Sequence, residues 1–99
     1  MVFLEVRGDV DLANADEFRA AMRHPHTKGH RLVIDLSRCT FFDASAISAL
    51  IATYNARGRK RLPLVLPPNS FIRRLLAITS TEALFILHER PEDVRITDG

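Results

Sequence analysis

The side chains best suited to chemistry lie in the stretch FFDASAIS, residues 41–48, where an apolar run gives way to a predicted helix. Asp43 stands where a helix N-cap is expected, and its carboxylate can accept hydrogen bonds from backbone N–H groups two or three residues later. Ser45 then falls in the first turn, where unpaired N–H groups and the helix dipole favour negative charge. Three roles stay open for this serine: nucleophile, phosphate acceptor, or part of a helix cap.

The catalytic alternative is a hydrolase triad made of Asp43, Ser45 and a histidine such as His88. The chain lacks the G-x-S-x-G motif, and Asp and Ser two residues apart do not flank a histidine unless the fold brings one there. It also lacks a P-loop and a dinucleotide fingerprint. We therefore expect no catalysis and no cofactor.

Three histidines, His24, His26 and His30, gather in the segment HPHTKGH and raise the question of a metal site. Their spacing suits a loop rather than one face of a helix, and no cluster of cysteines or carboxylates joins them. Histidines in loops are usually solvated, so we expect no bound metal.

Positive charge is concentrated in RGRKR, residues 57–61, in a chain whose formal net charge is +2. Such a cluster can track phosphates, but it also suits the C-terminal dipole of a helix. The chain has no Trp and a single Tyr for stacking on bases, and it carries no known nucleic-acid-binding motif. We expect a solvated helix end and no nucleic-acid partner.

The chain has 99 residues, 46% of them hydrophobic, which suffices for one modest core and is too few for two. Its single cysteine, Cys39, cannot form an internal disulfide, and this fits a reducing compartment. No apolar run is long enough to span a membrane, and the first residues do not resemble a signal peptide. These features predict one cytoplasmic domain, with Cys39 as a buried thiol rather than a redox-sensitive one.

Strand-like and helix-like segments alternate along the chain. Strands are predicted at 2–7, 32–36, 62–66 and 84–87, helices at about 14–24, 44–57 and 69–76, and a short last helix from Pro91. The run LVIDL is mostly apolar, as in a strand buried on both faces. This order predicts an α/β fold in which helices pack on one mainly parallel sheet of about four strands.

Several local signals set the expected boundaries of these elements. The first strand should end at Gly8, while Asn14 with Glu17 forms a capping box for the first helix. Asn69 should cap the third helix. Pro63 indicates that its strand either starts there or lies at a sheet edge.

The helix at 44–57 has two unlike faces. Residues at helical spacing predicted to face the sheet are Ile47, Leu50, Ile51 and Tyr54. The opposite face carries Ser45, Ala49, Ala52 and Ala56, with Ser48 and Asn55 at its edge. A face of small residues allows another surface to approach closely, yet alanine also fills exposed helix positions through propensity alone. Both explanations stay open.

The stretch LVIDLSRCTFFDASAISALIATYNARGRK resembles the signature of the STAS domain, the fold shared by sulfate transporter tails and bacterial anti-sigma factor antagonists. The residues in register with the family pattern are Asp35, Thr40, Phe42, Asp43, Ser45, Ile47 and Leu50. Upstream, the sequence G-D-V-D at residues 8–11 resembles the family's G-x-L/V-D. The resemblance implies that residues 1–99 form one STAS-like domain, without the family's first edge strand and with a short last helix.

Antagonists of this family act by partner switching and are not enzymes. The unphosphorylated domain binds an anti-sigma factor that is an ATP-binding serine kinase, which frees a sigma factor for transcription. Phosphorylation of the first serine after the motif's Asp then dissolves the complex. In register, this serine falls on Ala44, which has no hydroxyl, and Ala46 replaces the usual glycine.

The resemblance therefore implies two sets of site residues. The partner-binding set is Asp43, Ala44, Ser45, Ser48, Ala49, Ala52 and Ala56; the phosphorylation candidates are Ser45, Thr40 and Ser48. Two functions remain: an anti-sigma factor antagonist, or a stand-alone STAS subunit of a transport or multi-protein sensory complex without a sigma factor. The missing first strand also leaves a sheet edge open for a homodimer.

Overall fold

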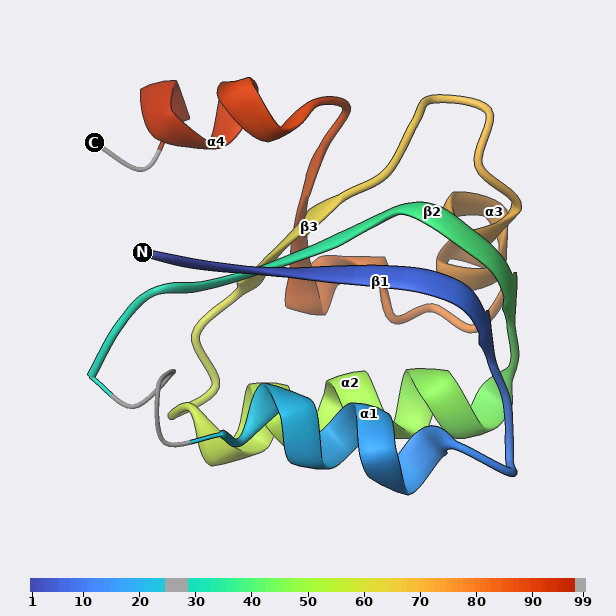
Figure 1. Cartoon of the computed structure of the whole chain (residues 1–99). Coiled ribbons are helices and arrows are strands. Elements are labelled where there is room, and N and C mark those ends of the chain that lie inside the picture. The colour runs from blue at the N-terminus through green and yellow to red at the C-terminus, as the bar shows by residue number, and fades with distance from the viewer. Residues whose placement is uncertain (25–28, 98–99) are drawn as a thin grey trace.

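The computed structural model describes residues 1–24 and 29–97, which wrap helices around one parallel sheet (Figure 1). In chain order the elements are β1 (Val2–Val10), α1 (Ala15–Met22), β2 (Leu32–Phe42), α2 (Ala44–Ala56), β3 (Leu62–Val65), α3 (Phe71–Ile78), the 3-10 helix η2 (Glu82–Leu84), β4 (Phe85–His88) and α4 (Pro91–Thr97). The four strands lie in the order β1-β2-β3-β4, and each neighbouring pair is parallel. The predicted fold class is confirmed.

The sheet is covered on both faces. Figure 1 shows α1 and α2 side by side along one face and α4 on the opposite side. The main core includes Ile34 and Leu64 from the strands, whereas Val33 and Val65 pack with Val94 of α4. Successive side chains in a strand point to opposite faces, and both faces of this sheet are covered. The whole run LVIDL is therefore buried, as predicted.

β1 and β2 extend further than the sequence indicated. β1 continues through Gly8, whose φ of +76° costs glycine little because it has no Cβ. The pairing of β1 with β2 shifts register twice. One shift lies between Glu5 and Arg7 of β1, and the other lies between Gly8 and Asp9. β2 pairs with β3 only at Ile34 and Asp35. Beyond that point β1 and β2 form a two-stranded extension, bent by its bulges, that leads into α2.

Asn14 is the N-cap residue of α1 as predicted, but its side chain does not make the predicted capping-box bond, and the predicted cap of α3 by Asn69 is wrong. The side chain of Asn14 accepts from the Asp11 N–H at 2.9 Å and donates to the Asp9 carbonyl at 2.8 Å, so it stabilises the turn before α1 and caps no helical N–H. Asn side chains compete in this way because they reach nearby backbone groups in turns. Ser70, and not Asn69, caps α3 by accepting from the N–H two residues later at 3.2 Å.

The last two strands follow the prediction with small shifts. Pro63 lies at the start of β3, but β3 is a central strand and not an edge. Its missing N–H is tolerated because the β2–β3 pairing begins only at Leu64. β4 begins at Phe85 rather than Leu84, since Glu82–Leu84 form a 3-10 turn. Within the described ranges, no helix has the length and apolarity that crossing a bilayer requires.

Candidate partner-binding site

Asp43 caps α2 at the point where β2 ends. Its Oδ1 atom accepts from the N–H of Ser45 at 2.9 Å and from that of Ala46 at 3.3 Å, with the backbone extended. Its carbonyl accepts from the Ile47 N–H at 3.1 Å. The predicted cap is confirmed, and its carboxylate occupies N–H groups that an incoming anion would otherwise use.

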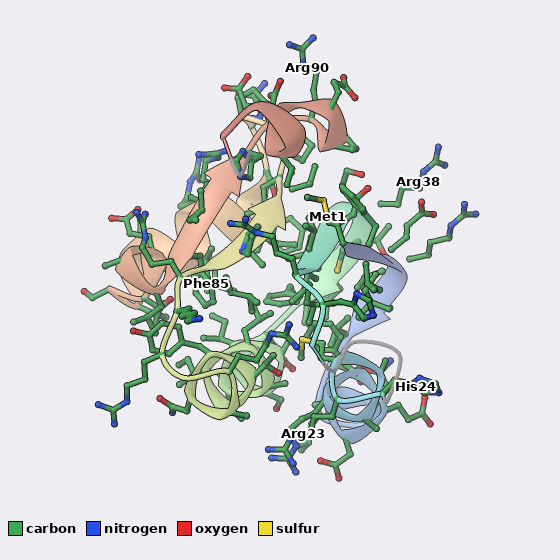
Figure 2. The ribbon with its side chains drawn as sticks, turned by 90° about the vertical axis from the view of Figure 1, so that its left-hand side faces the viewer. Met1, Arg23, His24, Arg38, Phe85 and Arg90 are labelled. Carbon is green, nitrogen blue, oxygen red and sulfur yellow. The ribbon has the colours of Figure 1, made fainter. Side chains whose placement is uncertain are left out.

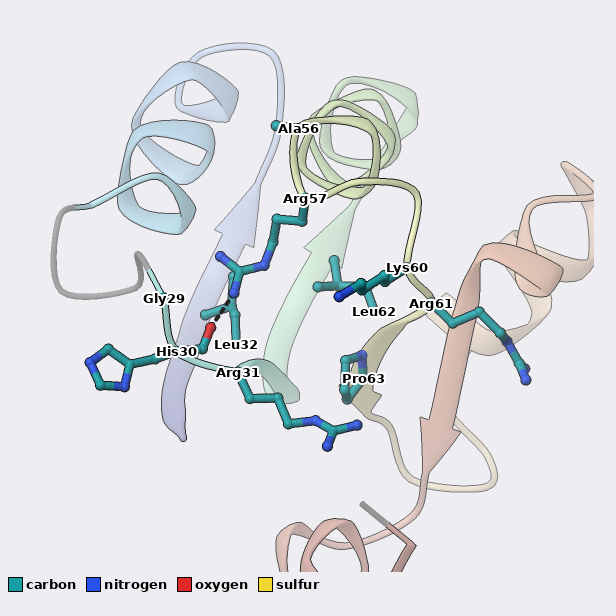
Figure 3. Close-up of a pocket in the computed structure, with 10 residues that line it drawn as sticks. All are labelled: Gly29, His30, Arg31, Leu32, Ala56, Arg57, Lys60, Arg61, Leu62 and Pro63. Atoms are coloured by element: carbon teal, nitrogen blue, oxygen red, sulfur yellow. Dashed lines mark hydrogen bonds between the residues drawn. The ribbon is translucent and has the colours of Figure 1, made fainter. Parts of the chain in front are cut away.

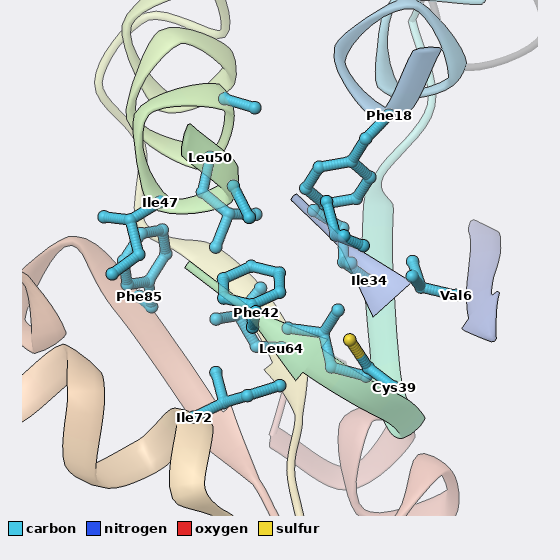
Figure 4. Close-up of a cluster of buried hydrophobic side chains, with 14 of the residues drawn as sticks. Val6, Phe18, Ile34, Cys39, Phe42, Ile47, Leu50, Leu64, Ile72 and Phe85 are labelled. Atoms are coloured by element: carbon cyan, nitrogen blue, oxygen red, sulfur yellow. The ribbon is translucent and has the colours of Figure 1, made fainter. Parts of the chain in front are cut away.

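An aromatic pair holds the end of β2, directly before α2, against α1. Phe42, the last residue of β2, packs edge-to-face on Phe18 of α1, with ring centroids 6.1 Å apart and an interplanar angle of 77° (Figure 4). Such a pair contributes roughly 0.5–1.5 kcal/mol beyond its buried area. The cap and the residues after it are therefore held in a defined position.

α2 is covered more deeply than its sequence indicated, because α1 packs along its side. Ala49 is 4% exposed, and Thr53, one turn later on the same side, places its hydroxyl 3.5 Å from the Met22 sulfur of α1. The prediction that Ala49 lies on the exposed face is wrong, since a second helix covers that side. Of the residues predicted to face the sheet, Ile51 and Tyr54 are only partly buried.

The exposed side of α2 forms a narrow stripe. Ala44, Ser48 and Asn55 are exposed, and Ile51 and Ala52 are partly exposed. These five residues, spaced three or four apart, are called the α2 stripe below. Small side chains dominate its first half, where a partner can approach the backbone closely.

The predicted phosphorylation candidates lie in different surroundings. Thr40 is exposed, and its hydroxyl donates to Asp9 Oδ1 at 2.6 Å, which joins the ends of β2 and β1. Ser45 is half-buried beside the cap, whereas Ser48 is exposed on the α2 stripe. Ala44 is exposed in the first turn of α2 and presents only a methyl group. Ser48 is therefore the candidate hydroxyl that a partner on the stripe would meet.

An apolar groove beside the start of α2 was not anticipated from the sequence. It is lined by Thr40, Phe41, Phe42, Phe71, Arg74, Leu75 and Ile78. Phe41 is 47% exposed, Phe71 45% and Ile78 72%. Phe71 and Ile78 are seven residues apart and share a face of α3, a spacing visible in the sequence. That spacing does not reveal whether another element covers the face.

The imagined hydrolase triad is not assembled in a hydrogen-bonded chain. Asp43 Oδ1 bonds to backbone N–H groups, and His88 is buried at the end of β4, where its Nε2 has no hydrogen-bond partner among the residues that the structure describes. His26 lies outside the described residues, so the loop histidines cannot be compared as a set. Among the residues that are described, no three His, Cys, Asp or Glu side chains are grouped to hold a metal ion.

Cys39 is a buried thiol, as predicted, and donates to the Phe41 carbonyl at 3.2 Å. Burial raises the pKa of this thiol above its ordinary value because desolvation disfavours the thiolate, and the charge of Asp9 acts in the same direction. Its backbone hydrogen bonds oppose the shift. A buried, protonated thiol is a poor nucleophile.

Comparison with known proteins identifies the family. A family model described as "Mlab, STAS domain" matches residues 2–87, so the chain belongs to the STAS domain family. A STAS-domain-containing protein of Pseudomonas aeruginosa (strain UCBPP-PA14) is 29% identical over 83 residues, covering 83% of this chain and 82% of the relative. The resemblance inferred from the sequence is confirmed.

Solved structures share the fold at low sequence identity. A sulfate transporter family protein from Wolinella succinogenes has a TM-score of 0.70 at 14% identity, over 91% of this chain and 77% of that one. The anti-sigma factor antagonist SpoIIAA in its unphosphorylated form has a TM-score of 0.61 at 16% identity, over 97% and 86%. The phosphorylated form of SpoIIAA, a Bacillus cell fate determinant, has a TM-score of 0.61 at 14% identity, over 96% and 88%. These likenesses concern the fold.

Proposed function

We propose that this STAS domain is a non-catalytic protein-binding module of the anti-sigma factor antagonist type, which binds an anti-sigma kinase and so releases a sigma factor. The observation that carries the binding role is the α2 stripe, which begins directly after the Asp43 cap. The apolar groove is lined in part by Phe41 and Phe42, the last two residues of β2, directly before the cap. Exposed aromatic side chains beside a face of small residues suit a protein contact with a few anchors in its centre.

Ala44 determines whether phosphorylation at this position can dissolve the proposed complex. In the family motif this position carries the serine whose phosphate dissolves the complex, and a methyl group accepts no phosphate. The proposed module therefore binds its partner without release at that position. Any switch must use another hydroxyl, and Ser48 is the best placed because it is exposed on the stripe. A phosphate there would add charge in the middle of the contact.

A second function, a permanent STAS subunit of a transport or multi-protein sensory complex, is favoured by the same residue. A subunit that never leaves its complex needs no phosphorylatable serine in the first turn of α2. The two functions share the α2 stripe as the binding surface and differ in the partner.

Affinity capture from the native host's cytosol, followed by mass spectrometry of partners and bait, tests both. The bait variant Ser48→Arg places a long cation on the α2 stripe, and Ala20→Arg places the same side chain on an exposed position of α1 as a matched control. We expect an ATP-binding anti-sigma kinase to be captured by wild type and Ala20→Arg and lost with Ser48→Arg. Transporter subunits captured with the same variant pattern would support the second function instead.

A partner that is captured equally by all three baits would contradict the assignment of the α2 stripe. The bait spectrum adds an independent observation, because phosphate on Ser45, Thr40 or Ser48 would identify a switch that Ala44 itself cannot provide.

A further inference from the structure

A basic pocket of about 700 Å³ lies at the C-terminal end of α2, away from the Asp43 cap. It is lined by Gly29, His30, Arg31, Leu32, Ala56, Arg57, Lys60, Arg61, Leu62 and Pro63 (Figure 3). Three arginines and one lysine thus share this lining, and none of these ten residues is Asp or Glu. Its volume is in the range of small-molecule sites, which is roughly 300–1,000 Å³.

The cationic side chains have different tasks. Arg61 donates to the Phe85 carbonyl at 2.8 Å, and Figure 3 shows its side chain directed away from the others toward β4. Arg57 donates to the carbonyl of His30 and so ties the end of α2 to the segment before β2. A guanidinium has five N–H donors, so one such bond does not exhaust it.

Arg31, Arg57 and Lys60 surround the space over Leu32 and Pro63 (Figure 3). They come from two separate parts of the chain, which the parallel β2 and β3 strands bring together at their N-terminal ends. The dipole of α2 accounts for cations just after its last turn, but it does not account for Arg31, which precedes β2.

The turn between α2 and β3 has an unusual backbone conformation next to the pocket. Gly58 has a φ of +78° and Arg59, which is not a glycine, has a φ of +59°. A non-glycine residue in the left-handed region is uncommon and costs conformational energy. This turn positions Lys60 at the pocket.

We propose that this pocket binds a small, multiply charged, phosphate-bearing anion through Arg31, Arg57 and Lys60. Arginine matches phosphate with paired N–H donors and lysine adds a point charge, and none of the ten lining residues named above is a carboxylate. The phosphates of inorganic tripolyphosphate, of a nucleotide or of a phospholipid headgroup share this chemistry. A nucleic-acid strand is disfavoured because the lining has no Phe, Tyr or Trp on which bases could stack.

Isothermal titration calorimetry with sodium tripolyphosphate at fixed ionic strength tests the site. We expect saturable binding with one site per chain. Lys60→Glu and Arg31→Glu should each weaken it by about tenfold to a hundredfold or more, because each removes a hydrogen bond to a charged group and also places a carboxylate beside the anion. Arg38→Glu is the matched control: it makes the same change of charge on β2, where Figure 2 shows the side chain extending away from the fold. Circular dichroism would verify that each variant is folded.

Two further arms distinguish the source of the phosphate. ATP bound with the same variant pattern would point to a nucleotide, and co-sedimentation with phosphatidylglycerol vesicles that is lost in Lys60→Glu would point to a lipid headgroup. Absence of saturable tripolyphosphate binding, or equal weakening by Arg38→Glu, would overturn the proposal. Tighter binding of a single-stranded oligonucleotide than of tripolyphosphate would overturn it in favour of nucleic acid. Ser48→Arg should bind tripolyphosphate as wild type does, so this test is independent of the α2 stripe.

Discussion

The same substitution at two adjacent residues of α2 should change the stability of the domain by very different amounts. Ser48 is exposed on the α2 stripe, whereas Ala49 is 4% exposed on the side that faces α1. Ser48→Glu and Ala49→Glu introduce the same side chain one position apart, so their effects through the helix dipole are nearly equal, and helix propensity separates them by less than about 0.7 kcal/mol. The difference between the two variants therefore reports burial.

The expected difference is large compared with the stability of the domain. A chain of this length has a free energy of unfolding of about 5–15 kcal/mol. At position 49 the glutamate must enter a packed space, which costs roughly 1–3 kcal/mol, and its carboxylate loses water, which costs several more. We expect a loss of about 4 kcal/mol or more and a fall in Tm of roughly 15 °C or more. Ser48→Glu should stay within about 0.5 kcal/mol of wild type.

Urea unfolding followed by circular dichroism measures both variants, and thermal melts give the change in Tm. Similar stability of Ala49→Glu and Ser48→Glu would refute the packing of α1 along this side of α2. If Ala49→Glu is instead fully unfolded, Ala49→Ser provides a milder step whose cost should still exceed that of Ser48→Ala.

Two other perturbations follow from single contacts. Asp43→Ala removes the acceptor of two N–H groups at the start of α2 and should lower the free energy of unfolding by about 1 kcal/mol, measured by urea titration; an unchanged midpoint would contradict the cap. Burial raises the folded-state pKa of Cys39 above its unfolded value of about 9.0, so its contribution to stability is complete below that pH and is lost as pH rises through the folded pKa. Unfolding free energies measured from pH 7 to 10 should fall more steeply above about pH 9 in wild type than in Cys39→Ala, and parallel curves would contradict the burial of the thiol.

Interactions within a few residues could be predicted from the sequence. Asp43 as the cap of α2 depends only on backbone N–H groups two and three positions later, and the buried run of β2 depends on consecutive apolar side chains. The lack of a hydroxyl at Ala44 is likewise a matter of residue identity in a local motif. Asn14 shows the limit of such reasoning, because several nearby backbone groups compete for one side chain.

Only the tertiary structure decided which surfaces are free. Helical periodicity shows that Ala49 and Ala52 lie near one side of α2, but not that α1 covers the first and leaves the second partly exposed. The basic pocket depends on packing in the same way: the parallel sheet brings Arg31 beside Lys60, almost thirty residues later in the chain. Local sequence specifies which side chains share a face or a turn, while contacts between distant elements determine which faces remain exposed and which charges meet.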